Sequence, residues 1–219
     1  MSDLNGYELK KFDAEQQLIA LHKISVILSH SLNMEQTLQQ VLSCLEELAG
    51  MQFGMVTLQN EDRQGMLVQA LHGANPEVIR DVARIKYRTN EGILGAVQAK
   101  GETQVIVKVS QDPRFLDRLG LYDYNLPLIC VPLGNSSNRA GVLVAQPVSG
   151  VLSELTAKTR FLEMVANLIM QTLTLSNTVQ KRSKSYKIVM TNYFQIIKKQ
   201  MALRLWWVIP LQCDKYLKP

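Results

Sequence analysis

The charged residues between Asp112 and Asp123 are the densest set in the chain that could bind a ligand. The segment DPRFLDRLGLYDYNLP places Arg114 and Arg118 four residues apart among three aspartates. Two guanidinium groups can hold one carboxylate through charge-assisted hydrogen bonds. Alternatively, the arginines form ion pairs at the surface with Asp112, Asp117 and Asp123. The sequence leaves both interpretations open.

A glycine-rich turn and two tyrosines could complete such a site. The turn at Asn90, Glu91 and Gly92 precedes an apolar, helix-like stretch. A helix start can present N–H groups to an anion, but a single turn of this kind is a weak phosphate signal and packing explains it better. Tyr122 and Tyr124 could close over a pocket, although packing is again the more common role. The candidate ligand site is therefore Arg114, Arg118, Tyr122, Tyr124, Asn90, Glu91 and Gly92.

Catalytic or metal chemistry is not indicated by the cysteines and histidines. The three cysteines are far apart and form no CxxC pair, which signals neither a disulfide framework nor a zinc site. Cys130 lies in an apolar run, where burial raises the pKa of a thiol, and Cys44 lies on a helix face. His22, His30 and His72 have no carboxylate at a spacing typical of a triad. We predict no enzyme activity and no resident cofactor.

Hydrophobic spacing predicts long helices at both ends of a domain. Apolar side chains repeat every three or four residues from Glu15 to Leu28, and Asn33 and Gly50 are suited to cap a second helix. A last long helix is expected from Ser153. The expected apolar positions are Leu18, Leu21, Ile24, Ile27 and Leu28 in the first helix and Phe161, Val165, Leu168, Thr172 and Leu175 in the last.

The middle of the chain predicts a sheet with short helices between its strands. Residues 53–59 and 65–72 flank the polar stretch NEDRQ and predict a hairpin. Asp112, Pro113 and Gly120 are suited to the cap, first position and end of a short helix. Residues 127–133 predict a strand buried on both faces near the sheet centre. The remaining expected elements are strands at 103–109 and 139–148 and helices near 76–83, 90–101 and 113–119. This order predicts an α+β fold with a mostly antiparallel sheet.

Several of these segments together resemble a known family. The stretches EGILGAVQAKG, VSQDPRF, ICVPL and GVLVAQ, in this order and spacing, resemble the GAF domain, a sensory fold that holds a small ligand between its sheet and an overhanging lip. The resemblance covers about residues 15–178. DPRFLDRLGLYDYNLP and TRFLEMVANLI resemble more specifically the N-terminal regulatory domain of NifA-type nitrogen-fixation activators. Asn90 departs from the glycine usual in the family, but Asn tolerates a left-handed backbone.

The resemblance implies a sensor domain of a sigma-54-dependent activator. Its expected signals are a small acid such as 2-oxoglutarate, an antiactivator of the NifL type, or both. DNA and the sigma-54 polymerase would be contacted only through domains absent from these residues. Three alternatives stay open: a stand-alone GAF-fold protein that binds a small molecule, a GAF-fold redox enzyme such as a methionine sulfoxide reductase, and a nucleic-acid-binding protein that uses its basic tail.

Charge and hydropathy restrict location and partners. The net charge of +5 comes from residues 180–219, where nine Lys and Arg oppose the single acid Asp214. The rest of the chain is slightly acidic and gives no electrostatic footprint for DNA. The start lacks the apolar core of a signal peptide, and no apolar run approaches the roughly 20 residues that span a bilayer. We predict a cytoplasmic protein without membrane contact.

Surplus apolar positions on the first and last helices predict a homodimer. Ile19 and Val26 lie outside the stripe that one sheet face needs, and so do three residues of the last helix. Two copies could therefore form a helical bundle across a two-fold axis. The three positions in the last helix are Leu162, Ile169 and Leu173.

The C-terminal segment breaks the pattern of the domain. We divide the chain into an arm (1–14), a sensory domain (15–178) and a basic, disordered tail (179–219). Tryptophan has the single codon TGG, which restricts the possible nucleotide sequence at the two adjacent tryptophans. Reading the codons of residues 205–216 one base earlier permits the sequence VGNSxAMRQV, which resembles the opening of the AAA+ domain of these activators. We hypothesise a frame change after about Gln180 that truncates the activator; the alternative is a natural extension.

Overall fold

The computed structural model describes residues 14–30, 33–60, 62, 64–74, 85–135 and 138–208. The chain forms two compact units, Met1–Leu173 and Thr174–Pro219. The first unit holds the sheet and the candidate site.

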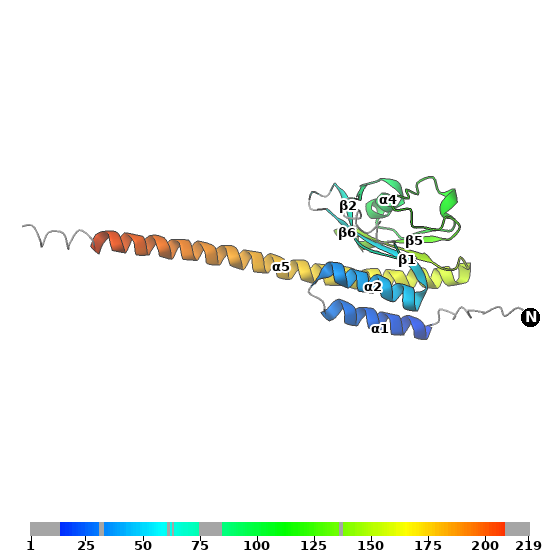
Figure 1. The fold of residues 1–219 in the computed structure, drawn as a ribbon, viewed down its shortest axis with the longest axis horizontal. Helices are drawn as coiled ribbons and strands as arrows, with labels where there is room; N and C mark the ends of the chain where they lie inside the picture. Colours follow the sequence, from blue (N-terminus) through cyan, green and yellow to red (C-terminus); the bar gives the residue numbers. More distant parts are fainter. Residues whose placement is uncertain are drawn as a thin grey trace, which may run out of the picture. The chain divides into compact units, whose positions relative to one another are not determined.

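A six-stranded antiparallel sheet forms the centre of the first unit (Figure 1). Its strand order is β3-β2-β1-β6-β5-β4, so β1 and β6 are central and β3 and β4 form the edges. The strands are β1 (Met51–Gln59), β2 (Gly65–His72), β3 (Lys86–Arg88), β4 (Gln104–Ile106), β5 (Leu128–Asn135) and β6 (Asn138–Pro147). The predicted α+β fold with an antiparallel sheet is confirmed.

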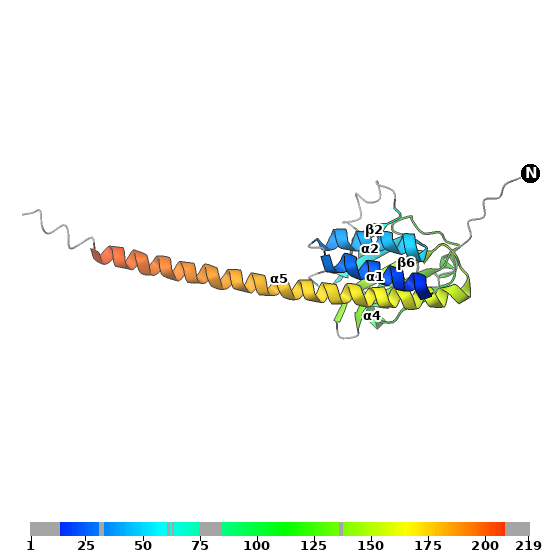
Figure 2. The same ribbon diagram turned by 90° about the horizontal axis from the view of Figure 1, so that it is seen from below.

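Three helices lie on one side of this sheet; two pack against it, and the first packs on the second, farther from the sheet (Figures 1 and 2). They are α1 (Ala14–His30), α2 (Met34–Ala49) and the first part of α5 (Leu152–Val208). The side chain of Asn33 accepts hydrogen bonds from the Glu35 and Gln36 N–H groups, and Gly50 ends α2 in the left-handed conformation, as predicted. The layer between helices and sheet is almost wholly aliphatic, with Phe161 as its one buried aromatic residue among those described. This face is a hydrophobic core.

The opposite face is covered by α4 (Gly92–Lys100), a 3-10 turn (Val109–Gln111) and a loop that we call the lip, residues 112–127. The core on this side contains methionines, a cysteine and tyrosines as well as aliphatic residues. Polar atoms are thus present beneath the lip and α4, where the candidate site lies.

The strands differ from the sequence prediction in three respects. The hairpin of β1 and β2 is confirmed, but the predicted strand at 103–109 is reduced to Gln104–Ile106 because it pairs only with β5 at the sheet edge. β5 is buried on both faces as predicted, yet it is next to the edge strand and not at the centre. β3 was not predicted, since three residues carry too little pattern.

The predicted helix at 113–119 is absent from the lip, which has no helix at these residues. The Asp112 carboxylate accepts a hydrogen bond from the Arg114 N–H at 2.9 Å, and the Asp117 carboxylate accepts one from the Gly120 N–H at 2.7 Å. Side chains that bond nearby N–H groups in this way compete with helical hydrogen bonding. Gly120 still takes the predicted positive φ, at 62°. The expected helix near 76–83 lies outside the described residues.

Two predicted helix faces are also corrected. Leu18 and Leu175 were expected in the apolar faces but are exposed. Leu162, Ile169 and Leu173 were expected at a dimer surface but are buried in the core. Periodicity locates an apolar stripe on a helix, but the packing of α1, α2 and α5 decides which edge of that stripe is covered.

The second unit consists, where described, of the part of α5 that runs from Thr174 to Val208. The prediction of disorder from residue 179 is therefore wrong as far as Val208. No glycine or proline interrupts the sequence between Gly150 and Pro210, which leaves a helix free to continue. None of the helices in the described part of the chain is both long and apolar enough to cross a membrane.

Candidate functional site

The lip is fastened to the sheet by a buried glutamine of β6. Gln146 is fully buried, and its side-chain N–H donates to the Asp123 carbonyl at 2.9 Å while its side-chain oxygen accepts from the Asp123 N–H at 2.8 Å. Asp123 lies in a loop and has no neighbouring strand, so the Gln146 side-chain amide supplies the partners for its backbone N–H and C=O groups. This pair fixes the C-terminal half of the lip over the sheet.

Aromatic rings pack between the lip and the sheet. Tyr122 makes edge-to-face contacts with Phe53 of β1 at 6.3 Å and with Phe115 at 5.8 Å between ring centroids. Phe115 also meets Tyr124 edge-to-face at 5.8 Å. Edge-to-face pairs of this kind are favoured by the ring quadrupoles. Tyr122 lies inside the core, whereas Tyr124 is exposed and its hydroxyl donates to Asp117 at 2.9 Å.

Arg118 joins the lip to β3 and to the turn before α4. Its guanidinium forms an ion pair with Glu91 at 2.5 Å, donates to the Lys86 carbonyl of β3, and lies 5.2 Å from the centre of the Tyr87 ring. A guanidinium over a tyrosine face gains a cation–π contribution. Burial raises the pKa of Tyr87 to about 12, so this ring stays neutral. We call this set of contacts the Arg118 latch.

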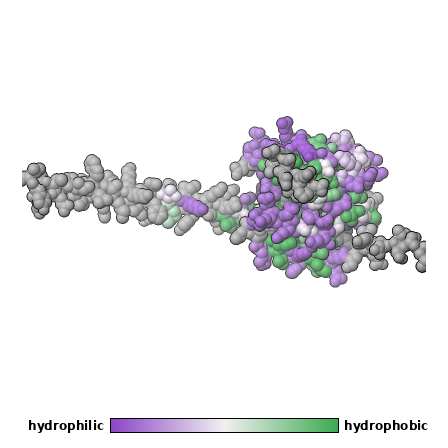
Figure 3. All heavy atoms as spheres, in the orientation of Figure 1, coloured by the Kyte–Doolittle hydropathy of each residue, from purple (hydrophilic) through white to green (hydrophobic). Residues whose placement is uncertain are grey.

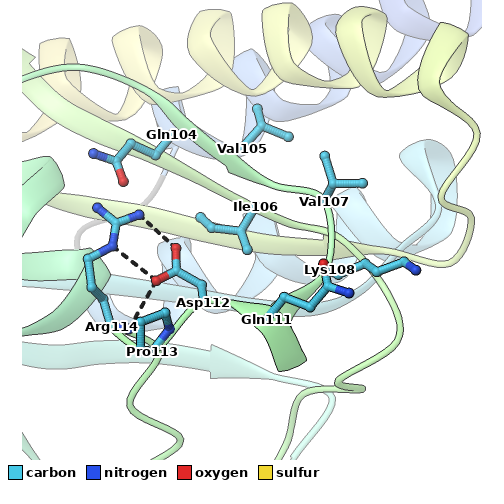
Figure 4. Close-up of a pocket in the computed structure, with 9 residues that line it drawn as sticks. All are labelled: Gln104, Val105, Ile106, Val107, Lys108, Gln111, Asp112, Pro113 and Arg114. Atoms are coloured by element: carbon cyan, nitrogen blue, oxygen red, sulfur yellow. Dashed lines mark hydrogen bonds and ion pairs between the residues drawn. The ribbon is translucent and has the colours of Figure 1, made fainter.

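Arg114 is paired within the lip and does not join Arg118. Its guanidinium donates to both carboxylate oxygens of Asp112, at 3.0 and 2.6 Å. These hydrogen bonds lower the pKa of Asp112. The pair borders a shallow depression of about 590 Å³ beside β4, whose lining also includes Gln104 and Lys108 (Figure 4). Neither arginine pairs with Asp117 or Asp123, so only the Asp112 part of the predicted surface pairing is observed.

The turn before α4 is closed off by the lip. Asn90 and Gly92 both take positive φ angles of 64°, which confirms that Asn90 can replace glycine there. A Cβ on Gly92 would lie 2.9 Å from the Arg114 carbonyl oxygen, so the lip approaches closely only because this residue is glycine. The Glu91 carboxylate accepts from the Arg88 N–H at 2.9 Å, and mainly this bond lowers the pKa of Glu91. The turn therefore contacts the lip and positions Glu91.

Two buried polar atoms beneath this cover have no hydrogen-bond partner within the described part of the chain. They are the Tyr122 hydroxyl and the side-chain oxygen of Gln98 in α4. Both side chains are more than nine-tenths buried. Burial raises the pKa of Tyr122 well above its usual value, so the hydroxyl remains a donor. An unsatisfied buried polar group costs about 1–3 kcal/mol and calls for an explanation such as a bound ligand or water.

Thiol chemistry has no suitable group at this site. Cys130 of β5 is fully buried, and burial raises its pKa to about 12. Cys44 in α2 is also buried, and its pKa is raised for the same reason. A reactive cysteine needs an accessible thiolate. Within the residues that the structure describes, no three His, Cys, Asp or Glu side chains gather where they could hold a metal ion.

Two residues of the site were missed by sequence reasoning. Gln98 and Gln146 are polar residues inside otherwise apolar runs, GILGAVQAK and GVLVAQP. A polar side chain at an inward position of a buried element must find a partner, which is a usable signal. Of the seven predicted residues, Arg118 and Glu91 form an ion pair, and Gly92 lies against the backbone of Arg114. Tyr122 and Tyr124 both contact Phe115, and Asn90 lies in the turn before α4.

The arrangement of a lip and a helix over an antiparallel sheet matches a known family. The sequence pattern of the GAF domain matches residues 33–173. This chain belongs to the GAF domain family. Among solved structures, the GAF domain of a phosphoenolpyruvate-protein phosphotransferase from Coxiella burnetii has a TM-score of 0.67 at 20% identity, covering 77% of this chain and 99% of that chain. The free methionine-R-sulfoxide reductase of Neisseria meningitidis reaches 0.62 at 18% identity over 82% of this chain and 99% of that chain. These identities show the fold alone.

Closer relatives identify the kind of GAF domain. A Nif-specific regulatory protein of Enterobacter agglomerans is 46% identical over 169 residues, which are 77% of this chain and 33% of that protein. The Nif-specific regulatory protein of Azotobacter vinelandii is 40% identical over 160 residues, 73% of this chain and 31% of that protein. The chain spans about a third of the length of these relatives. They confirm the predicted resemblance of this GAF domain to Nif-specific regulatory proteins.

Proposed function

We propose that this GAF domain is the signal-sensing domain of a sigma-54-dependent activator of nitrogen-fixation genes. The regulatory character follows from the relatives, which are Nif-specific regulatory proteins. The signal, the polymerase and the partner are part of the proposal. In this proposal the domain binds a small molecule beneath the lip, and this binding alters a protein contact made elsewhere on the molecule.

The observation that carries the ligand proposal is the pair of unpartnered polar atoms beneath the lip. The Tyr122 hydroxyl can donate and the Gln98 oxygen can accept, and both are buried among apolar and aromatic residues. Ligand sites are typically apolar cavities with a few polar groups that fix orientation. A compact molecule with an acceptor oxygen can take the hydrogen bond of the Tyr122 hydroxyl. 2-Oxoglutarate has such oxygens but no donor at neutral pH, so the Gln98 oxygen would need a different partner, such as a water.

A small acid such as 2-oxoglutarate would have to compete with a carboxylate of the protein. Arg118 is already paired with Glu91, and Arg114 with Asp112. The Arg118 pair is the more consequential one because it closes the lip against β3 and α4. A ligand carboxylate that replaces Glu91 on Arg118 would therefore open the latch. Binding and opening of the lip become one event, which is what a sensor requires.

The second expected signal is an antiactivator of the NifL type. A lip that changes its contacts on ligand binding would present a different surface to such a partner. The two signals are then coupled, and each ligand changes the affinity of the other by the same factor.

The test is calorimetric titration of the whole chain with 2-oxoglutarate. We expect saturable binding that Tyr122→Phe weakens by about tenfold, the loss of roughly one hydrogen bond. Tyr124→Phe is the matched control because that hydroxyl is at the surface on Asp117, and it should bind normally. A pull-down with the antiactivator, with and without 2-oxoglutarate, tests the second signal. Absence of both interactions would overturn the proposal.

A further inference from the structure

One edge of the sheet is open along β4. This strand pairs with β5 on one side, and no strand in the described part of the chain pairs with its other side. The backbone of an unpaired edge can accept a further strand, and proteins often protect such edges with charged side chains or proline. The stretch TQVIV, residues 103–107, contains neither. We call the unpaired side of residues 104–108 the β4 edge.

Side chains alternate along the β4 edge between the two faces of the sheet. Gln104 and Ile106 point towards Arg114, whereas Val105 and Val107 point away from it (Figure 4). Both valines are exposed, at 38% and 50%. In the view of Figure 3, the described surface of the first unit is mostly hydrophilic, with separate hydrophobic patches. Two exposed β-branched side chains beside an unpaired backbone form a contact surface suited to an extended chain.

The depression of about 590 Å³ runs beside this edge. It is lined by residues 104–108 on one side and by residues 111–114 on the other. Its charged residues are Lys108, Asp112 and Arg114, and the Asp112 carboxylate is already held by Arg114. Lys108 forms no ion pair with any residue that the structure describes. The lining therefore has a net positive charge, which favours acidic side chains in an occupant.

Both ends of the β4 edge are held in place. At its start, the Thr103 hydroxyl donates to the Glu163 carboxylate of α5 at 2.7 Å. Just beyond its end, Val109 is buried and the Ser110 N–H donates to the Tyr124 carbonyl at 3.1 Å. An edge that is already ordered loses little conformational entropy when a partner binds.

We propose that the β4 edge binds an extended segment of a partner protein in which hydrophobic and acidic side chains alternate. The segment adds a further strand to the sheet, and its backbone hydrogen bonds with β4 supply affinity. Its hydrophobic side chains lie beside Val105 and Val107, and its acidic side chains enter the depression near Lys108 and Arg114. A partner helix fits this edge less well, because its backbone groups are already paired within the helix.

This site is separate from the ligand site proposed beneath the lip. Tyr122 and Gln98, whose unpartnered atoms carry that proposal, do not line the depression. A chain that fails to bind 2-oxoglutarate can therefore still bind a strand, and the reverse also holds.

Calorimetric titration of the whole chain with a synthetic peptide tests the proposal. The probe is the peptide TVEVEVT, acetylated and amidated at its ends, which alternates hydrophobic and acidic side chains. We expect saturable binding with a dissociation constant on the order of 0.1 mM or tighter. Hydrogen exchange with bound peptide should become slower in residues 104–108 and stay unchanged in α2. The same peptide N-methylated at every residue keeps its side chains but has no backbone donors, so it should not bind.

A charge exchange tests the acidic part of the proposal. Lys108→Glu should weaken binding of TVEVEVT by about threefold to tenfold, because it replaces an attraction at the surface with a repulsion. The peptide TVKVKVT should bind this variant more tightly than it binds the wild type. Lys187→Glu is the matched control, since it makes the same change of net charge at an exposed position of the second unit. It should leave binding unchanged.

Four results would overturn the proposal. The first is no binding at the highest peptide concentration. The second is equal binding of the methylated peptide, because backbone pairing would then contribute nothing. The third is a Lys108→Glu variant that does not distinguish the two charged peptides. The fourth is peptide binding that weakens as the concentration of the chain rises, which would show that a second copy occupies the edge.

Discussion

The two faces of the sheet are built from different kinds of interaction. On the helical face, α1, α2 and α5 enclose a nearly all-aliphatic core in which Ile24, Leu38 and Phe161 are completely buried. On the lip face, the cover is a loop held by polar contacts, those of Gln146 with Asp123 and those of Arg118 with Glu91 and the Lys86 carbonyl. Burial of apolar surface is non-directional, whereas a hydrogen bond depends steeply on its distance and angle. The helical face therefore stabilises the domain, and the lip face can change state.

The largest expected effect is on the helical face. Phe161→Ala removes the largest completely buried side chain and should lower the free energy of unfolding by about 3–5 kcal/mol. Urea denaturation followed by circular dichroism measures this. Met164→Ala, three residues on at an exposed position, should cost less than about 1 kcal/mol. Equal losses in the two variants would show that this face is not the stabilising one.

A smaller effect is expected where the lip is fastened. Gln146→Leu keeps the volume but leaves both backbone groups of Asp123 without their buried partner, at a cost of about 1–3 kcal/mol. Hydrogen exchange should accelerate in residues 112–127, while exchange in α2 stays slow. Gln52→Leu is the control, since its side chain reaches Gln146 only at the limiting distance of 3.5 Å. Uniform acceleration over the whole domain would contradict a locally held lip.

The Arg118 latch should respond to pH in one direction. The pKa of Glu91 is lowered in the folded chain, first by the Arg88 N–H and then by Arg118. Because the pKa of Glu91 is lower in the folded than in the unfolded chain, its carboxylate stabilises the folded chain at pH values above the ordinary pKa of about 4.3. This stabilisation is lost as the pH falls through the pKa of the folded chain. Lip exchange, corrected for its intrinsic pH dependence, should therefore increase below about pH 4. Glu91→Gln should remove the part of the pH dependence of lip exchange that comes from the Glu91 carboxylate. An unchanged profile would exclude the latch.

The helical face could be predicted from the sequence to a greater extent than the lip face. Asn33, Gly50 and the β1–β2 hairpin carry local signals of a few residues, and each was found where it was predicted. The Arg118–Glu91 pair joins residues 27 positions apart, and the Gln146–Asp123 pair joins residues 23 apart. Such pairs depend on the completed sheet, which no local pattern encodes. Asp112 and Asp117 had the right chemistry for caps, but their bonds made turns in place of a helix.

The smallest expected effect has the opposite sign. Tyr122→Phe removes a buried hydroxyl that has no partner among the described residues, while the ring keeps its contacts with Phe53 and Phe115. Because the hydroxyl was desolvated without compensation, its loss should raise the free energy of unfolding by up to about 1 kcal/mol in the ligand-free chain. Denaturation with and without 2-oxoglutarate measures both effects, and the ligand should stabilise the wild type more than the variant. Destabilisation of the ligand-free variant would show that the hydroxyl has a partner, such as an ordered water, and that the space beneath the lip is already satisfied.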